Sequence, residues 1–150
     1  MSNKFDFYLA GPFFNDRQQR CQDRIEEMMD YYGKKTFSPR RDAGKLGDHP
    51  TKAQMKKVFD ADLNAIDNCN ILFANVSSKD TGTSVEIGYA LAKNIPVIIY
   101  YDPQFAETDH VNLMIALACG GIVLENQDEL EAYLRGGVLP IKDKFNFLVD

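Results

Sequence analysis

This sequence has fewer basic than acidic residues. The 150 residues include 17 lysines and arginines against 22 aspartates and glutamates, which gives a formal net charge of −5. Proteins that bind DNA or RNA present clustered positive charge to the phosphate backbone, so we expect no nucleic-acid partner. This balance is compatible with a small uncharged ligand.

Cysteines are also few. Cys21, Cys69 and Cys119 are widely spaced and odd in number, and they form no CxxC or Cys/His pattern. We therefore expect neither a disulfide framework nor a metal site, and reduced thiols in the cytoplasm are the simplest interpretation.

Long apolar runs are missing. The most apolar region, residues 85–101, is interrupted by Lys93, Asn94 and Pro96, whereas a membrane span needs about 20 consecutive apolar residues. The first residues contain no long apolar stretch, so no signal peptide is expected. These absences predict a chain without a membrane partner.

Two kinds of catalytic or binding pattern are absent as well. His49 and His110 both fall in polar loops, and no Ser/His/Asp set accompanies them. A glycine-rich phosphate cradle is not visible either, because Gly11 is followed by Pro12, which has no N–H to offer an anion.

Apolar runs and amphipathic stretches alternate along the chain. We expect strands at residues 5–10, 35–37, 70–76, 96–101 and 121–124. Helices lie between and after them, three of them opened by the N-cap residues Asn15, Thr51 and Asn126. This alternation predicts an α/β fold of the flavodoxin-like (Rossmann-type) class. It is a three-layer sandwich whose five-stranded parallel sheet has the order 2-1-3-4-5. Residues 1–150 are expected to form one domain.

Two segments do not fit this alternation. Residues 38–50 form a long polar loop, which is often a functional feature in a compact domain, and residues 138–150 look irregular. In the predicted sheet, ligands bind at the carboxyl ends of the first and third strands. The loops there are residues 11–14 and 77–82, and Glu86 follows in the next turn.

Asp62 places a carboxylate in the middle of an apolar helical stripe formed by Met55, Val58, Phe59 and Ile66. Burying a charge costs several kcal/mol unless it is paired or hydrogen-bonded. Asp62 is therefore either a structural group held by backbone amides or an arginine, or a carboxylate that faces a partly desolvated site.

Glu86 also has two interpretations. With Thr83 it matches a capping box at the start of a helix, which would be a structural role. Alternatively, a carboxylate near a helix N-terminus is favoured in its ionised form and can attack an anomeric carbon. A second acid nearby would then protonate the leaving group, and in retaining glycosidases two such carboxyls lie about 5 Å apart.

Five motifs in this order resemble the nucleoside 2-deoxyribosyltransferase family, and the resemblance covers nearly the whole chain. They are YLAGPFF at residues 8–14, FSPR at 37–40, DLNAI at 62–66, DTGTSVEIG at 80–88 and NLM at 112–114. Relatives often end in an aromatic-rich tail that approaches the base. The segment FNFLVD at 145–150 lacks a final tyrosine, so no role is carried over to it.

The resemblance implies roles for the matched residues. Glu86 corresponds to the nucleophile, Tyr8 to the tyrosine that orients it, and Asp62 to the acid that handles the proton of the departing base. The implied substrate-binding residues are Asp80 and Asn112 at the sugar hydroxyls, Phe13 at the base, Met114 from a neighbouring subunit, and Gly11, Gly82 and Arg40 in the matched motifs.

The resemblance also implies the reaction and the assembly. Deoxyribose would move from a deoxynucleoside to a free nucleobase in a ping-pong, retaining reaction through a covalent Glu86 ester, without a metal or organic cofactor. Because Asn112 and Met114 serve a neighbour's site in this family, a homo-oligomer is expected, either a dimer or a hexamer built as a trimer of dimers.

Two rival functions differ in what they require. The first is an N-glycosidase that hydrolyses deoxynucleosides or their 5′-monophosphates. To act on the monophosphates it would need a phosphate-binding site. Phe13 and Phe14 occupy the first loop instead, whereas Arg17, Arg40 and Arg41 keep this alternative open. A phosphoacceptor module would need a carboxylate at the end of the third strand, where the sequence has Ala-Asn-Val at 74–76.

Overall fold

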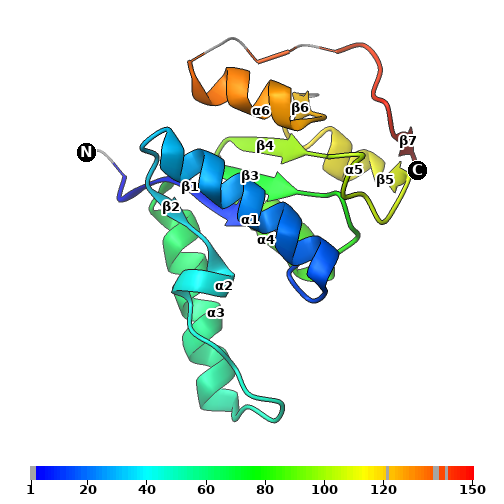
Figure 1. Cartoon of the computed structure of the whole chain (residues 1–150). Coiled ribbons are helices and arrows are strands. Elements are labelled where there is room, and N and C mark those ends of the chain that lie inside the picture. Colours follow the sequence, from blue (N-terminus) through cyan, green and yellow to red (C-terminus); the bar gives the residue numbers. More distant parts are fainter. Residues whose placement is uncertain (1–2, 121, 137–138, 141) are drawn as a thin grey trace.

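A computed structural model describes residues 3–120, 122–136, 139–140 and 142–150. Its main sheet has five parallel strands in the order β2-β1-β3-β4-β6 (Figure 1). The strands are β1 (Phe5–Ala10), β2 (Thr36–Phe37), β3 (Cys69–Asn75), β4 (Val97–Tyr100) and β6 (Val123–Leu124). Because β5 (His110–Val111) lies outside this sheet, β6 is the fifth strand of the sheet in chain order. The predicted order 2-1-3-4-5 is therefore confirmed. Gly121, expected in the last strand, lies outside the described residues.

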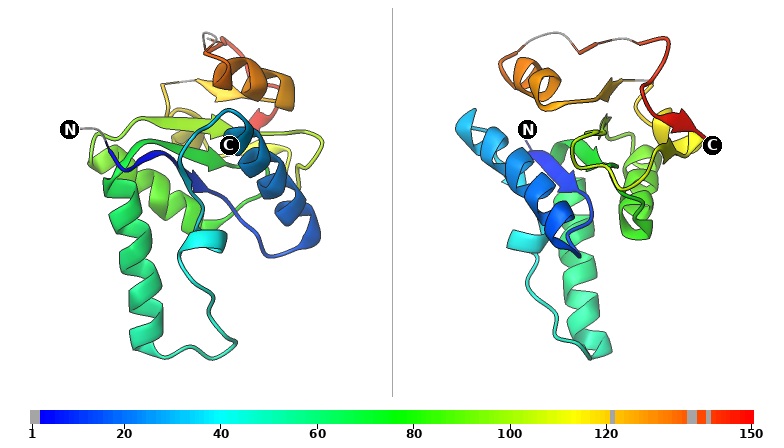
Figure 2. Two further views of the ribbon diagram at one scale, coloured as in Figure 1. Left: turned by 60° about the vertical axis from the view of Figure 1, so that its left-hand side comes forward. Right: turned by 45° about the vertical axis from the view of Figure 1, so that its right-hand side comes forward.

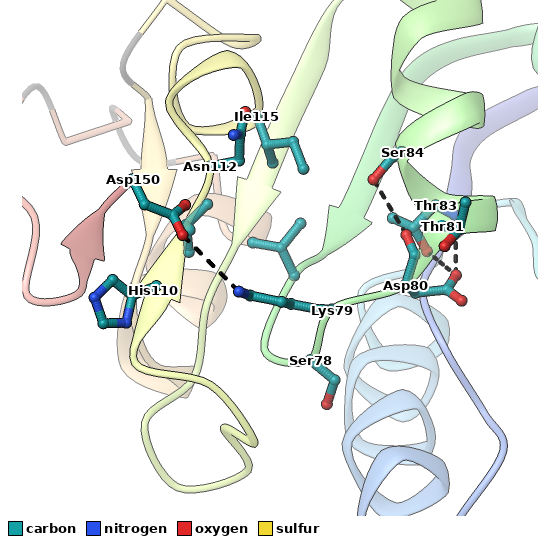
Figure 3. Close-up of a pocket in the computed structure, with 12 residues that line it drawn as sticks. Ser78, Lys79, Asp80, Thr81, Thr83, Ser84, His110, Asn112, Ile115 and Asp150 are labelled. Atoms are coloured by element: carbon teal, nitrogen blue, oxygen red, sulfur yellow. Dashed lines mark hydrogen bonds and ion pairs between the residues drawn. The ribbon is translucent and has the colours of Figure 1, made fainter.

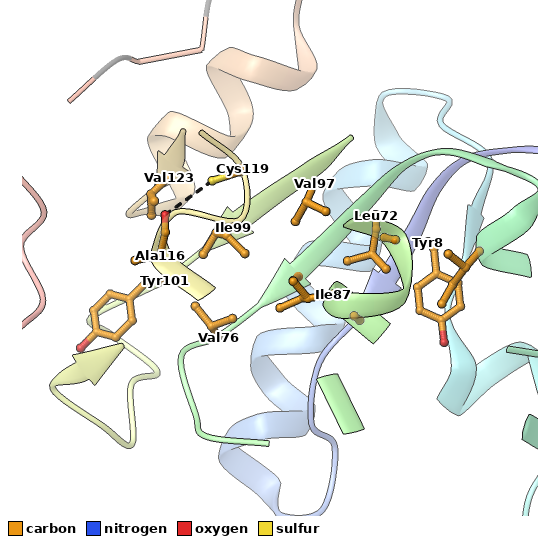
Figure 4. Packing of buried hydrophobic residues seen from close by; sticks show 14 of the residues in the cluster. Tyr8, Leu72, Val76, Ile87, Val97, Ile99, Tyr101, Ala116, Cys119 and Val123 are labelled. Carbon is orange, nitrogen blue, oxygen red and sulfur yellow. Dashed lines mark hydrogen bonds between the residues drawn. The ribbon is translucent and has the colours of Figure 1, made fainter. Parts of the chain in front are cut away.

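Successive residues of each strand face opposite sides of the sheet, and this alternation builds two apolar cores. In β1, Tyr8 and Ala10 join the core under α3 (Lys52–Asp67), α4 (Thr81–Ala92) and α5 (Leu113–Ala116), part of which is drawn in Figure 4. Phe7 and Leu9 join the core under α1 (Asp16–Tyr31) and α6 (Gln127–Leu134). The three predicted layers are therefore present.

Three predicted helix starts are confirmed by their capping bonds. The side chain of Asn15 accepts from the Gln18 N–H at 2.9 Å, and that of Asn126 accepts from the Glu129 N–H at 2.8 Å. Thr51 and Gln54 form a reciprocal capping box. Satisfied N–H groups at these positions explain why the helices begin there.

The two segments that broke the alternation carry short elements, which the sequence patterns did not predict. A single helical turn, α2 (Pro39–Asp42), opens the segment expected to be a polar loop. In the tail, β7 (Leu148–Val149) pairs in parallel with β5, so the prediction of an irregular tail was wrong at residues 148–149. Both elements are too short for a periodic pattern, and β7 depends on hydrogen bonds to Asp109 and Val111, far away in the chain.

The first half of α3 extends beyond the sheet, and the loop of residues 43–51 runs beside it (Figures 1 and 2). Met55 and Phe59 on this half are 46% and 56% exposed. Of the four residues in the apolar stripe expected around Asp62, only Ile66 is therefore buried. None of the described helices is long and apolar enough to cross a membrane.

Candidate functional site

A cavity of about 740 Å³ opens at the carboxyl ends of β1 and β3, where the sequence predicted a ligand site. The β1–α1 loop, the α2 region, α3 and the start of α4 all contribute to its wall. The lining residues are Gly11, Phe13, Phe14, Gln19, Pro39, Arg40, Gly44, Lys45, Leu46, Val58, Asp62, Asp80, Gly82 and Glu86.

Glu86 is held from beneath by Tyr8, whose hydroxyl donates a hydrogen bond to Glu86 Oε2. Tyr8 is fully buried in β1 and stacks on Phe37 of β2, with ring centroids 5.6 Å apart. Burial raises the pKa of Glu86 to about 7, and the nearby Asp62 and Asp80 carboxylates act in the same direction, whereas the Tyr8 hydrogen bond lowers it. The site therefore contains a positioned carboxyl group that titrates near neutral pH.

The capping role considered for Glu86 was wrong. Helix α4 begins at Thr81, and its N-cap is Asp80. Asp80 Oδ2 accepts from the Thr83 N–H at 2.9 Å and from the Thr83 hydroxyl at 2.6 Å. Aspartate is among the best N-cap residues, and here Asp80, not Thr83, is the N-cap of the helix. Glu86 therefore lies in the second turn of α4, takes no part in capping the helix, and lines the cavity.

Asp62 lies in the same cavity, supplied by α3. Its Oδ1 atom is buried and has no hydrogen-bond partner among the described residues, and burial raises the pKa of Asp62 to about 6. The structural interpretation needed amides or an arginine to hold the carboxylate, and in the described part of the chain none binds Oδ1. A buried oxygen without a partner is rare in folded proteins, and this one belongs to a residue that lines the cavity.

Arg40 lines the cavity, but its charge is already neutralised. The guanidinium pairs with Glu26 at 2.7 Å and also with Asp23. The hydrogen bond to Glu26 is the largest of the effects that raise the pKa of Arg40. A guanidinium held by two carboxylates is a poor site for a further anion, so Arg40 serves the cavity as a wall and not as an open cation.

Asn112 and Met114 lie elsewhere in the single chain. Asn112 lines a second cavity of about 360 Å³, between the start of α4 and the β5–α5 region (Figure 3). Its side-chain oxygen accepts from the Met114 N–H at 2.9 Å, which makes it the N-cap of α5, and Met114 is 76% exposed. Asp80 lines both cavities, whereas neither Asn112 nor Met114 lines the cavity of Glu86.

The motif analysis missed several residues of the Glu86 cavity. Lys45 and Leu46 come from the loop that was marked as functional by its length, and Val58 comes from the stripe around Asp62. Pro39 lies in the matched FSPR motif but was given no role, and Gln19 gave no signal of its own. Within the described residues, no group of three or more His, Cys, Asp or Glu side chains is placed to hold a metal ion.

The parallel sheet and its cavity of partly buried carboxylates define the class of this protein as an α/β enzyme. More narrowly, the sequence profile of the nucleoside 2-deoxyribosyltransferase family matches residues 7–131, and the chain belongs to that family. It is therefore an enzyme of the pentosyltransferase type.

Individual relatives agree with this placement. An uncharacterized protein of Ureaplasma parvum is 30% identical over 139 residues, which cover 84% of this chain and 87% of that protein. The solved 2-deoxyribosyltransferase of Bacillus psychrosaccharolyticus is 28% identical with a TM-score of 0.75, covering 93% of this chain and 98% of that one.

A more distant similarity concerns the fold alone. The CMP N-glycosidase of Clostridium botulinum is 19% identical with a TM-score of 0.54, covering 87% of this chain and 95% of that one.

Proposed function

We propose that this enzyme transfers 2-deoxyribose from a deoxynucleoside to a free nucleobase through a covalent ester on Glu86. The observation that carries the proposal is that Asp62 of α3 and Glu86 of α4 line one cavity, while the buried Tyr8 of β1 holds Glu86 through a hydrogen bond. A positioned nucleophile and a second, separate acid are the groups that a two-step displacement at an anomeric carbon requires.

In this proposal the reaction has two steps. In the first, a carboxylate oxygen of Glu86 bonds to C1′ while the C1′–N bond breaks, and Asp62 gives its proton to the departing base. In the second, a nitrogen of the incoming base bonds to C1′, the ester bond to Glu86 breaks, and Asp62 takes the proton of that base. Each step inverts C1′, so the configuration is retained. No metal or organic cofactor takes part in this scheme.

The remaining cavity residues bind the substrate in this proposal. Asp80 uses Oδ2 for capping, and we assign Oδ1 to a sugar hydroxyl. Phe13 and Phe14 stack with centroids 5.1 Å apart and form an aromatic wall for the base. Gly11 and Gly82 let the backbone come close to the substrate.

A homo-oligomer is part of the proposal. Exposed large apolar side chains gather on the helices of one sheet face: Met55, Phe59, Val85, Leu91, Leu113, Met114 and Leu117. Helix α4, which carries Val85 and Leu91 of this set, has Glu86 as its only charged residue. A helix that is apolar on all sides is typically buried. A second copy on this face, in a dimer or a trimer of dimers, would bring Asn112 and Met114 to a neighbour's cavity.

We further propose that residues 1–150 act as one domain, and that the enzyme works in deoxyribonucleoside salvage in the cytoplasm.

The alternative is hydrolysis by an N-glycosidase acting on deoxynucleosides or their 5′-monophosphates. The arginines that kept the monophosphate version open are engaged within the chain. Arg40 pairs with two acids, Arg41 donates to the Thr36 carbonyl at 2.7 Å, and Arg17 donates to the Ala106 carbonyl at 3.3 Å. Lys45 is the feature that favours a phosphate, because it lines the cavity.

One assay separates the two functions. The enzyme is incubated with deoxyinosine or deoxyuridine, with and without free adenine, and the products are separated by chromatography. Transfer predicts deoxyadenosine only when adenine is present, and the glycosidase predicts free base and deoxyribose at the same rate in both reactions. A Glu86→Gln sample is the control for both outcomes.

A further inference from the structure

A buried pair of side-chain amides borders the candidate active site. Gln22 of α1 and Asn75 at the end of β3 are 1% and 2% exposed. Asn75 Nδ2 donates to Gln22 Oε1 at 2.9 Å, and the Ser77 N–H donates to Asn75 Oδ1 at 3.2 Å. The amide of Asn75 thus has both its donor and its acceptor hydrogen-bonded. Such a buried group favours a single arrangement, because another one leaves a polar atom unpaired.

The chain that leaves β1 rests on this pair. Ala10 of β1 is in register with Ala74 of β3, so Gly11 and Asn75 occupy neighbouring positions at the sheet edge. A Cβ atom at Gly11 would lie 2.8 Å from Gln22 Oε1 and 3.0 Å from Asn75 Cβ. Only glycine allows so close an approach, and the position of the loop is set by the side chains beneath it.

The same network reaches the segment that leads to α4. The Ser77 hydroxyl accepts from the Asp102 N–H at 2.9 Å, and the Ser77 carbonyl accepts from the Glu107 N–H at 2.8 Å. Helix α1, the β3–α4 segment and the loop after β4 are therefore joined through hydrogen bonds, and the β1–α1 loop meets this network through the close packing of Gly11. Gln22 and Asn75 are nevertheless not among the described residues that line the Glu86 cavity.

We propose that Gln22, acting through Asn75, is a positioning residue that fixes the loop of residues 11–14 and thereby the affinity for the nucleobase. This inference rests on the proposed function. Phe13 and Phe14 of that loop line the cavity, whereas Glu86 is held separately by Tyr8. A displaced loop therefore weakens base binding and leaves the displacement at C1′ largely intact.

Three variants test the proposal. Gln22→Met keeps the length of the side chain and removes the amide, whereas Gln22→Glu keeps an oxygen that accepts from Asn75. Ile25→Ala is the control, because Ile25 is fully buried on the same helix and its truncation destabilises the protein without touching the pair.

For Gln22→Met we expect KM for both the donor nucleoside and the acceptor base to rise about tenfold or more, since small displacements of binding groups carry large kinetic costs. Its kcat should stay within about threefold of wild type. Gln22→Glu should keep a KM near wild type, and Ile25→Ala should lower the melting temperature with KM unchanged.

An unchanged KM in Gln22→Met, or an equal rise in Ile25→Ala, would overturn the proposal. If Gln22→Met does not fold, Gln22→Asn replaces it, because its shorter side chain keeps an amide that cannot reach Asn75. An unchanged KM in Gln22→Asn would also overturn the proposal. Wild-type transfer to adenine tests the proposed function separately. Without such transfer, faster hydrogen exchange at residues 11–14 in Gln22→Met but not in Ile25→Ala still supports the positioning role, and equal exchange rejects it.

Discussion

The Glu86 carboxyl is partly buried near two other carboxylates, and its pKa of about 7 is well above the ordinary value of 4.5. A carboxyl whose pKa is raised on folding stabilises the protein fully below its unfolded pKa. That stability is lost as the pH rises through the folded value, here between about 4.5 and 7. Ionised Glu86 therefore weakens the fold above pH 7, in the form that the proposed chemistry needs.

Glu86→Gln should accordingly reduce transfer to below about one-hundredth of wild type and raise stability at pH 8 by on the order of 1–3 kcal/mol. The amide keeps an acceptor for the Tyr8 hydroxyl and has no charge to bury. Urea unfolding at pH 8 and pH 5 measures the effect, and the gain should shrink at pH 5. A variant that retains substantial transfer would remove Glu86 as the nucleophile.

Tyr8→Phe should move the pH dependence of activity. The hydrogen bond from Tyr8 lowers the pKa of Glu86, so its loss raises that pKa, and the nucleophile becomes ionised only at higher pH. The acidic limb of the kcat/KM profile should shift upwards from about pH 7. Tyr89→Phe is the matched control, because the Tyr89 hydroxyl donates to Asp67, and it should leave the limb in place.

Asp62→Asn should slow transfer most for bases that must be protonated to leave. Burial holds the pKa of Asp62 at about 6, so a fraction of the enzyme carries the needed proton near neutral pH, and asparagine cannot supply it. Rates with good and poor leaving bases measure the difference. Asp60→Asn is the control, because Asp60 is exposed and pairs with Lys56. Equal slowing for all bases would make Asp62 structural.

At the scale of elements, Asp80 combines the N-cap of α4 with a place in both cavities. Asparagine caps a helix about as well as aspartate, and alanine does not. Asp80→Asn should therefore keep the stability of wild type, whereas Asp80→Ala should lose about 1 kcal/mol. If Asp80 holds a sugar hydroxyl, both variants lose activity. Thermal unfolding and KM for the deoxynucleoside, measured on both variants, separate the capping role from the binding role.

The elements that could be predicted from the sequence are those with a local cause. The positions of the strands follow from the apolar runs, and the starts of α1, α3 and α6 follow from capping residues three positions before their partners. The strand order was predicted from the usual arrangement of five-stranded flavodoxin-like sheets. The start of α4 was misassigned because both Asp80 and Thr83 are good caps, and only the folded backbone decides between them.

Other features depend on residues far apart in the chain. The β5–β7 pair joins residues nearly forty positions apart, and the Gln22–Asn75 pair joins α1 to β3. Neither leaves a periodic trace in the sequence. Asp62 could be marked in advance because a carboxylate in an apolar helical stripe is unusual, and Glu86 because it follows the loop at the carboxyl end of the third strand. Gln19 and Leu46 carry no such signal.

At the scale of the whole molecule, the two faces of the sheet differ. The large apolar side chains exposed on helices lie mainly on α3, α4 and α5, whereas on α1 and α6 Tyr31 is the large exposed one among the described residues. A lone chain gains nothing from such a face, and contiguous exposed apolar surface marks interaction sites. Asn112 and Met114 lie on this face but not in the chain's own Glu86 cavity. In the proposed oligomer, a partner copy would bring them to a neighbour's site.

Mixing two inactive variants tests the shared site. Glu86→Ala lacks the nucleophile, and Asn112→Ala lacks the residue that we expect to cross the interface. After subunit exchange, some mixed interfaces combine an intact Glu86 from one copy with an intact Asn112 from the other, so part of the activity should return. Glu86→Ala mixed with Asp62→Ala is the control, because both residues line one cavity of the same chain, and every cavity in that mixture lacks one of them. Light scattering should show at least a dimer. A fully active monomer, or no rescue despite exchange confirmed by mass labelling, would mean that Asn112 acts within its own chain and that the exposed face serves another purpose.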